Sequence, residues 1–341
     1  MPRHILAIRF SSLGDIAMTV PVIKNVLAQN PDLHISFLSV DFVKPLFEGI
    51  DRLHFYGINL AQYKGLPGLH KLAGKMRKEI SFDAVADLHN VLRTKILKVF
   101  LRSKMTASLD KGRREKEKLT QPENKIMLPL KTTFQRYADV FTTLGIQVTL
   151  NNKTGISQLK PNPALLNFDT DNKRVLIGFA PFAKHRAKMY PLHKTEAVIE
   201  MLIRNGNIKI LIFGNKNEFG LLNKSISHAP AVFIVSGKYT FTEELNIISQ
   251  LDVMISMDSA NMHLASLYGI PVVSVWGGTH PFLGFGGWAQ HAENIIQTDL
   301  PCRPSSVFGN KDCPVHGARG CMQNVTPKII AERVSSVLRN I

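Results

Sequence analysis

The sequence predicts an α/β protein made of two doubly wound, Rossmann-like domains, each with a parallel sheet. Short apolar runs alternate with helical segments along most of the chain, which is the pattern of parallel strands joined by crossover helices. The stretch Leu251–Gly278 contains one complete strand–helix–strand unit. Its apolar runs are Asp252–Ser256 and Pro271–Trp276, and Gly269 ends the helix Asn261–Tyr268 between them.

The length of the chain points to two hydrophobic cores. With 341 residues, it exceeds what a single core usually serves. The weakly periodic segment Gly145–Lys173, which contains Pro161 and Pro163, is typical of an interdomain linker. We therefore expect domains at residues 1–158 and 159–325, followed by an amphipathic helix within residues 326–341.

The composition is that of a globular protein from a reducing compartment. Hydrophobic residues make up 45% of the chain, and the sequence contains no apolar run of the about 18 residues that span a bilayer. Arg9 interrupts the apolar run at the N-terminus, which does not resemble a signal peptide. Three cysteines give no disulfide framework. These features predict a cytoplasmic protein.

An excess of positive charge predicts an anionic partner. Lysine and arginine number 42, aspartate and glutamate 26, and the formal net charge is +16. The cations are dispersed apart from the mixed run Lys111–Lys118, and the sequence carries no zinc-finger, RRM or basic-zipper pattern. This distribution favours a phosphorylated metabolite or an acidic lipid surface over nucleic acid.

In the first domain, apolar runs between turn residues predict strands, and stretches of helical period predict helices. The strands are expected at His4–Phe10, His34–Val40, Leu53–Tyr56 and Phe82–Asp87, and the helices at Ile16–Ala28, Asp41–Phe47, Leu60–Glu79, Val91–Leu101 and Lys131–Leu144. The second domain repeats the alternation before Leu251–Gly278. Its strands are expected at Arg174–Phe179, Ile208–Phe213 and Val232–Val235, with helices ending at Arg204, Ser227 and Gln250.

The turn after the first strand is a candidate acid–base site. It joins a strand to a helix at the edge where parallel sheets bind ligands. The turn is not GxGxxG, so the dinucleotide fingerprint is absent. Gly14 lets the backbone approach a ligand closely, and Asp15 stands at the helix N-terminus. Asp15 is therefore either a helix cap or a general base.

Two cations, Arg93 and Lys95, lie in the first turns of the helix that follows the Phe82–Asp87 strand. They point roughly to the same sheet edge as Asp15, and together with it they suit an acidic acceptor. The alternative is a basic helix face exposed to solvent.

The ligand edge of the second domain combines a cationic loop with a helix N-terminus. Lys184 and Lys188 lie in a loop just past a strand end, with a histidine and an arginine between them. Asp258 and Ser259 lie where a strand ends and a helix begins, and His263 follows on the same helical face. Helix N-terminal amides and lysines bind phosphate without a metal ion, so this edge suits a nucleotide diphosphate.

The three cysteines fall in one short segment that also contains a histidine. Cys302, Cys313, His316 and Cys321 make a valid zinc set, although their spacing matches no standard finger. The alternative is free, buried thiols. A second metal-like pattern, Asp169–Asp171, precedes a strand instead of following one, and we expect it to form a turn.

Four segments of the sequence form a recognisable set: ILAIRFSSLGDIAMTVPVIKNV, DLHNVLRTK, the loop ending in KMYP, and ISMDSANMHLASLYGIPVVSVWGGTHP. Together they resemble glycosyltransferase family 9, the ADP-heptose:lipopolysaccharide heptosyltransferases, over nearly the whole chain. The resemblance implies a GT-B architecture, in which an acceptor-binding domain and a nucleotide-sugar-binding domain face each other across a cleft. It also implies an inverting transfer without a metal or other cofactor, and a final helix, 326–341, that packs back on the N-terminal domain.

The resemblance assigns roles to single residues. Asp15 matches the catalytic base, and Lys188 matches a lysine that contacts the phosphates or sugar of the donor. Asp258 matches the aspartate beside the donor sugar, and His263 the histidine on the following helix. Glu218 looks like the acid that holds the ribose hydroxyls. Tyr239 falls where backbone atoms contact the adenine.

The sequence also departs from the family pattern. Ala183 and Lys184 stand where the heptosyltransferases often have two threonines, and Asp258-Ser259-Ala260 stands where they often have Asp-Thr-Gly. The missing hydroxyls leave the exact donor sugar open. Lys184 adds a cation where phosphate would lie, so diphosphate binding is still expected.

The expected function is transfer of a heptose or related sugar from ADP-heptose to a lipopolysaccharide inner-core or other lipid-linked acceptor, at the inner face of the cytoplasmic membrane. The expected donor-binding residues are Lys184, Lys188, Glu218, Tyr239, Asp258, Ser259, Ala260 and His263, and the expected acceptor-binding residues are Ser12, Gly14, Arg93 and Lys95. Two alternatives are a GT-B-shaped sugar-nucleotide epimerase, which needs no acceptor, and a non-catalytic sugar-nucleotide-binding module.

Overall fold

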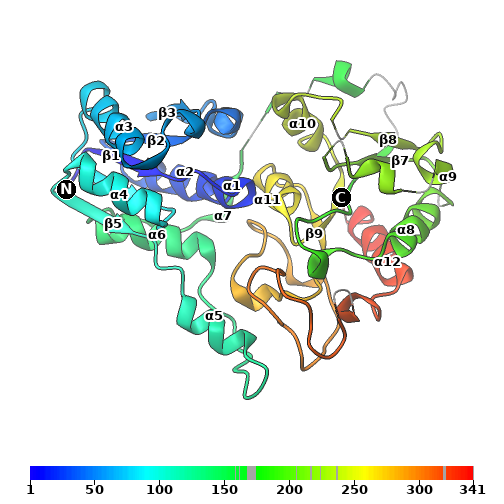
Figure 1. Ribbon diagram of the computed structural model, residues 1–341. Coiled ribbons are helices and arrows are strands. Elements are labelled where there is room, and N and C mark those ends of the chain that lie inside the picture. Colours follow the sequence, from blue (N-terminus) through cyan, green and yellow to red (C-terminus); the bar gives the residue numbers. More distant parts are fainter. Residues whose placement is uncertain are drawn as a thin grey trace. The chain divides into compact units, whose positions relative to one another are not determined.

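The computed structural model describes the chain except for residues 158, 161, 167–173, 205, 216, 223, 236, 318–319 and 341. The chain divides into two compact units, whose elements are labelled in Figure 1. Unit 1 consists of Met1–Gly112 and Lys131–Ile156, and unit 2 of Arg113–Leu130 and Ser157–Ile341. The turn expected at Asp169–Asp171 lies outside the described residues.

Unit 1 is built on a fully parallel sheet with the strand order β3-β2-β1-β4-β5. The chain moves outward from β1 to β3 and then returns to the other side of β1 with β4, so the order reverses between β1 and β4. In open α/β sheets ligands bind at that reversal, outside the carboxyl ends of the strands. The strands are β1 (His4–Ile8), β2 (His34–Val40), β3 (Leu53–Ile58), β4 (Ala84–Asp87) and β5 (Met105–Ser108).

Apolar side chains that alternate along β1 anchor the helices of unit 1. Leu6 and Ile8 join a buried cluster with Leu72 and Met76 of α3 and Leu97 of α4. The α-helices of unit 1 are α1 (Leu13–Ala17), α2 (Thr19–Gln29), α3 (Gly65–Glu79), α4 (Leu92–Leu101), α6 (Thr133–Thr143) and α7 (Asn152–Gly155). The short 3₁₀ helices are η1 (Asp41–Phe47) and η2 (Leu60–Gln62).

The first predicted helix, Ile16–Ala28, is divided in the structure at Met18. Two shorter helices, α1 and α2, flank this residue. The cause is Pro21, which has no N–H to donate to the Ala17 carbonyl and whose ring would clash with that carbonyl in a continuous helix. The break leaves α1 as a short turn of helix that carries Asp15 just past the end of β1.

Unit 2 is built on a second fully parallel sheet, with the order β11-β10-β9-β6-β7-β8. Here the order reverses between β6 and β9, so the ligand crevice is expected outside the carboxyl ends of these two strands. The strands are β6 (Val175–Ala180), β7 (Ile208–Ile212), β8 (Val232–Ile234), β9 (Val253–Met257), β10 (Val272–Val275) and β11 (Ile295–Ile296). The predicted fold class, α/β with two doubly wound parallel sheets, is confirmed.

The α-helices of unit 2 are α5 (Arg113–Thr120), α8 (Leu192–Arg204), α9 (Lys224–Ser227), α10 (Phe241–Ile248), α11 (Ala260–Leu267) and α12 (Pro327–Leu338). Its 3₁₀ helices are η3 (Pro163–Leu166), η4 (Arg186–Lys188), η5 (Phe219–Leu221), η6 (Pro281–Leu283), η7 (Ala292–Asn294) and η8 (Gly320–Met322). Among the described residues, the helices are all too short or too polar to cross a membrane.

The packing of residues 326–341 on the N-terminal domain stays a prediction. Within unit 2, α12 lies beside α8 (Figure 1). The reason is its apolar stripe: Ile330, Val334 and Val337 are buried in the cluster that contains Val198 and Leu202 of α8. The helix therefore completes the hydrophobic core of unit 2.

A segment expected in the first domain also belongs to unit 2. Residues 113–130, which include α5, leave unit 1 after Gly112 and return to it at Lys131. The Lys116 ammonium lies 4.1 Å from the centroid of the Phe285 ring, and the Leu130 N–H donates to the Phe282 carbonyl at 2.9 Å. The boundary near residue 158 is thus one of several crossings between the units.

Two neighbouring isoleucines of α12 test its place in the core. Ile330 is fully buried, whereas Ile329 is 46% exposed. We expect Ile330→Ala to lower the free energy of unfolding of unit 2 by about 2–5 kcal/mol, because it leaves a cavity between α12 and its neighbours. Ile329→Ala should change it by less than about 0.5 kcal/mol. Urea unfolding of both variants checks this, and equal effects would contradict the burial of one face.

Candidate active site

In unit 1, the switch point between β1 and β4 brings three polar side chains together. The strands end side by side, with Ile8 of β1 in register with Asp87 of β4. Arg9 and the Ser12–Asp15 turn follow β1, and His89 follows β4. The sheet order, and not the sequence spacing, therefore decides that these groups share one edge.

The Asp15 carboxylate is held by a cation and by its own turn. Its Oδ2 lies 2.9 Å from Arg9 Nη2 and accepts hydrogen bonds from Ser12 Oγ at 2.7 Å and from the Ser12 N–H at 3.3 Å. The bonds to Ser12 are those of a helix cap, so the capping interpretation of Asp15 describes part of its role. The carboxylate nevertheless stays 30% exposed, so it is also accessible to a substrate.

Arg9 is a functional candidate that the sequence interpretation missed. It is 5% exposed, its guanidinium stands over the Tyr137 ring at 5.4 Å, and Nη1 donates to the Leu88 carbonyl. The Tyr137 hydroxyl in turn donates to the Asp15 carbonyl at 3.3 Å. Burial raises the pKa of Tyr137 far above its usual value, so it remains a neutral donor. The available signal was a charged residue inside an apolar strand run.

His89 adds a neutral imidazole to this edge. Burial lowers its pKa to about 4, and the charges of Arg9 and Lys111 act in the same direction. The Phe10 N–H donates to Nδ1 at 3.4 Å, and Nε2 lies 3.3 Å from Ser11 Oγ. Because Nδ1 accepts, the single proton of the neutral ring belongs on Nε2, where it faces the Ser11 hydroxyl.

The other acceptor-site predictions of unit 1 have weaker structural support. Gly14 is buried inside α1, as its second residue. Arg93 and Lys95 are exposed in the first turns of α4. The cation of that helix that reaches the buried Asp87 carboxylate is Lys98, with Nζ 3.5 Å from Oδ2. The roles of Arg93 and Lys95 stay predictions.

In unit 2, the switch point between β6 and β9 carries a second aspartate–cation pair. Asp258 follows β9, and Lys188 lies in η4 after β6. Lys188 Nζ is 2.8 Å from Asp258 Oδ2, and the same oxygen accepts from Thr279 Oγ1 at 2.8 Å. The Lys188 and Asp258 side chains are only 15% and 5% exposed. The sequence placed both residues at this edge but did not predict that they pair.

Hydrogen bonds hold the turn after β10 in place beside Lys188 and Asp258. The Gly278 N–H donates to the Ala187 carbonyl at 2.7 Å, which ties this turn to η4. Arg303 is 1% exposed and donates to the carbonyls of Gly277 at 2.5 Å and Thr279 at 2.9 Å. Arg303 was also missed, because nothing in its local sequence predicts burial.

The start of α11 contributes backbone amides to the same edge. Ser259 is its N-cap in extended conformation, and its hydroxyl lies 3.2 Å from Ser256 Oγ. Ala260 is the first helical residue, and His263 is buried one turn later. Because α11 is eight residues long, its N-terminus attracts anions through the N–H groups of its first turn and through the helix dipole.

The remaining donor-site predictions lie on loops at the same carboxyl edge. Lys184 is exposed in the loop after β6. Glu218 follows β7 and accepts from the Asn215 N–H at 2.8 Å through Oε2, which closes its own turn. Tyr239 is half-buried after β8. The cysteine cluster, residues Cys302, Cys313, His316 and Cys321, does come together in unit 2.

Two doubly wound parallel units, each with an aspartate–cation pair at its switch point, define an α/β protein of the GT-B class. The chain belongs to glycosyltransferase family 9 (heptosyltransferase), whose sequence model matches residues 69–315. It is therefore a glycosyltransferase. The predicted family, enzyme class and GT-B architecture are confirmed.

Proteins with similar sequence or structure include two from Escherichia coli and one from Veillonella parvula. The chain is 25% identical over 299 residues to lipopolysaccharide heptosyltransferase 3 of Escherichia coli, covering 83% of this chain and 85% of that protein. The glycosyl transferase family 9 structure from Veillonella parvula superposes with a TM-score of 0.81 at 16% identity, covering 99% and 98%. E. coli ADP-heptose LPS heptosyltransferase II gives 0.71 at 17% identity, covering 99% of each chain. These structural likenesses show the fold.

The neutral state of His89 predicts an acid-sensitive unit 1. The pKa of His89 is about 4 when folded and 6.5 at its ordinary value. As the pH falls below 6.5 the unfolded state binds a proton that the folded state does not. We therefore expect stability to be lost between pH 6.5 and about 4, by about 1–2 kcal/mol from this residue, because solvent screens the partly exposed ring. His89→Gln should flatten this part of the pH profile of unfolding, and His70→Gln, at an exposed position of unit 1, should not. Parallel profiles for all three proteins would contradict it.

The pairing of Lys188 with Asp258 predicts that substitution of Lys188 lowers the free energy of unfolding strongly, whereas substitution of Lys184 changes it little. Lys188→Met leaves a buried carboxylate without its cation, which should lower the free energy of unfolding by about 3 kcal/mol. Lys184→Met, at an exposed position, should change it by less than about 0.5 kcal/mol. The double variant Lys188→Met/Asp258→Asn should regain part of the loss. Additive losses in this thermodynamic cycle would contradict a direct pair.

Proposed function

We propose that the enzyme transfers a heptose, or a closely related sugar, from ADP-heptose to a lipopolysaccharide inner-core acceptor. The proposal is supported by membership of the heptosyltransferase family and by the similarity to lipopolysaccharide heptosyltransferase 3 of E. coli. The net charge of +16 suits an anionic, lipid-linked acceptor at the inner face of the cytoplasmic membrane.

The observation that carries the proposal is the arrangement of Asp15 at the unit 1 switch point. Arg9 and Ser12 fix its Oδ2, which orients the carboxylate for the role of a general base. The base removes the proton of the acceptor hydroxyl as that oxygen attacks the anomeric carbon of the donor. Neutral His89 lies at the same edge and adds no charge that would compete for Asp15.

The unit 2 switch point has the groups that a departing nucleoside diphosphate needs. Lys188 and the amides at the start of α11 stabilise the negative charge that develops on the leaving phosphate. Asp258 holds Lys188 in place and lies beside the donor sugar. Glu218 and Tyr239, on the loops after β7 and β8, are assigned to the ribose and the adenine.

These roles describe a single displacement with inversion at the anomeric carbon. The base and the leaving-group cations are supplied by side chains, so the transfer step needs no metal ion and no organic cofactor. An epimerase would act on the donor alone. Family membership and an aspartate held as a base for an acceptor hydroxyl favour transfer over that alternative and over a non-catalytic module.

The central prediction concerns Asp15. Asp15→Asn preserves the shape of the side chain and an acceptor for Ser12, but removes the base, so turnover of ADP-heptose with heptose-free core lipopolysaccharide should fall about 10²–10⁴-fold. Affinity for ADP, measured by calorimetry, should change less than about threefold, because the diphosphate binds through unit 2 groups. Asp139→Asn, an exposed aspartate paired with Lys131 in unit 1, is the matched control and should leave turnover unchanged.

Near-normal turnover of Asp15→Asn, with a loss of stability as its main effect, would reduce Asp15 to a helix cap. The same calorimetric titration with UDP and GDP tests the donor assignment. Binding of UDP at least as tight as that of ADP would contradict the assignment of ADP-heptose.

A further inference from the structure

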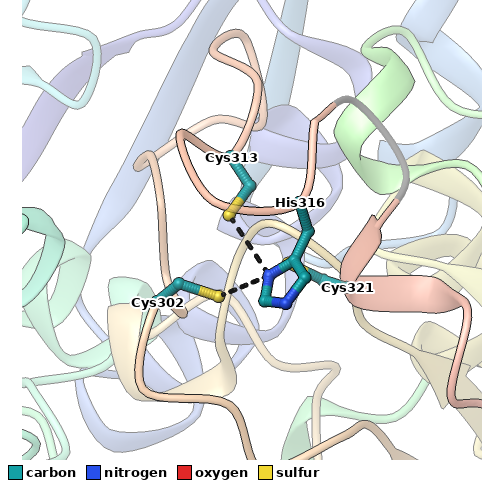
Figure 2. Close-up of side chains that lie close together, drawn as sticks. All are labelled: Cys302, Cys313, His316 and Cys321. Atoms are coloured by element: carbon teal, nitrogen blue, oxygen red, sulfur yellow. Dashed lines mark hydrogen bonds between the residues drawn. The ribbon is translucent and has the colours of Figure 1, made fainter.

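Four metal-ligating side chains of unit 2 meet outside the proposed transfer site. Cys302, Cys313, His316 and Cys321 each offer one ligand atom, and these atoms all lie within 4.8 Å of one another. Figure 2 shows the sulfur atoms of Cys302 and Cys313 directed at the imidazole of His316. Three thiols and one imidazole are a standard ligand set for tetrahedral zinc. We propose that these four residues bind one thiophilic divalent metal ion, normally zinc. We further propose that the ion fixes the loop that carries Arg303 beside the donor site, the edge of unit 2 that holds Lys188 and Asp258.

The distances fit a tetrahedral ion. With zinc–sulfur bonds of about 2.3 Å and zinc–nitrogen bonds of about 2.0 Å, the ligand atoms of a tetrahedron lie about 3.5–3.8 Å apart. His316 Nδ1 is 3.3 Å from Cys302 Sγ and 3.8 Å from Cys313 Sγ. Nδ1 is therefore the ligating nitrogen. The remaining pairs lie within 4.8 Å of one another, so they exceed the tetrahedral spacing by at most about 1.3 Å.

The backbone between Cys313 and Gly317 is folded to present two of the ligands. The Cys313 N–H donates to the Gly317 carbonyl at 3.2 Å, and the Gly317 N–H donates to the Cys313 carbonyl at 2.8 Å. This tight hairpin, closed by Gly317 at a φ of +71°, places Cys313 and His316 side by side. A Cβ at Gly320 would lie only 2.0 Å from His316 Cβ. A glycine is therefore required at position 320, directly before Cys321.

The surroundings suit a site with excess negative charge. Three thiolates and one neutral imidazole around a divalent ion carry a net charge of −1. Arg303 is 1% exposed and follows Cys302 directly in the chain. Lys125 Nζ donates to the Pro304 carbonyl at 3.0 Å, which holds it beside the loop. Two fixed cations next to three cysteines fit a metal thiolate centre better than three neutral thiols.

The site is connected to the donor site by one residue. Cys302 is followed directly by Arg303, whose guanidinium binds the carbonyls of Gly277 and Thr279. The Thr279 hydroxyl binds Asp258, which pairs with Lys188. An ion that fixes Cys302 therefore also fixes the position of the Arg303 side chain. Arg303 is a positioning residue, and its effect on the donor depends on the proposed function, whereas the metal site does not.

Metal analysis of the full chain, purified without added metal, tests the site. We expect about one equivalent of zinc, or of iron, per chain in the wild type and less than about 0.2 equivalents in Cys313→Ser and His316→Ala. His291→Ala, an exposed histidine of the same unit, is the matched control and should keep the metal. His316→Cys completes a four-cysteine set and should keep it too. Substoichiometric metal in the wild type, or metal content unchanged in both ligand variants, would overturn the site.

Two further measurements guard against variants that fail to fold. Cobalt(II) added to chelated wild-type protein should give the intense visible absorption of tetrahedral cobalt thiolate, and the absence of that spectrum would overturn the proposal. Chelation should lower the melting temperature of the wild type by about 5–10 °C but leave that of His316→Ala unchanged. Chelated wild type should also bind ADP about tenfold more weakly while retaining its folded circular dichroism spectrum. Unchanged ADP affinity would overturn the positioning role but leave the metal site standing.

Discussion

Each sheet of this protein depends on one kind of interaction at its ligand edge, an aspartate paired with a cation and a hydroxyl. In unit 1, Asp15 Oδ2 receives Arg9 and the Ser12 hydroxyl. In unit 2, Asp258 Oδ2 receives Lys188 and the Thr279 hydroxyl. In a parallel sheet, neighbouring strands end at the same edge, and the residues that follow them are partly buried there. A buried charge at this edge needs an opposite charge beside it. In open α/β sheets, ligands bind at these switch points, outside the carboxyl ends of the strands.

The two pairs differ in which partner is more exposed to solvent. Arg9 is buried and is held by Tyr137 and the Leu88 carbonyl, so Asp15 is the more exposed partner of its pair. In unit 2 the aspartate is the more deeply buried partner, and Lys188 is the one that reaches solvent. Solvent therefore reaches the carboxylate more easily in unit 1 and the ammonium more easily in unit 2. In each pair the more buried residue, Arg9 or Asp258, is the one that directly follows its strand.

Much of this was readable from the sequence, because strand ends and helix starts carry local signals. The β2 strand was predicted at its observed bounds, His34–Val40, and Asp15, Lys188 and Asp258 were placed at strand ends. What failed required tertiary context. Nothing local to Arg9 or Arg303 shows which carbonyls they will bind. β5, Met105–Ser108, has too few apolar residues to be recognised alone, and the stripe of α12 identifies a buried face without identifying its partner.

Residues 113–130 prevent the chain from being cut into two intact units at a single position. Because this segment belongs to unit 2 but interrupts unit 1, the polypeptide passes between the units at three points, after Gly112, Leu130 and Ile156. No single cut yields two intact halves. A fragment ending at Ile156 would carry eighteen residues without their partners and would strip Lys116 from the Phe285 ring. Dividing the chain into its two units would require residues 113–130 to be rejoined to unit 2 and residues 131–156 to unit 1.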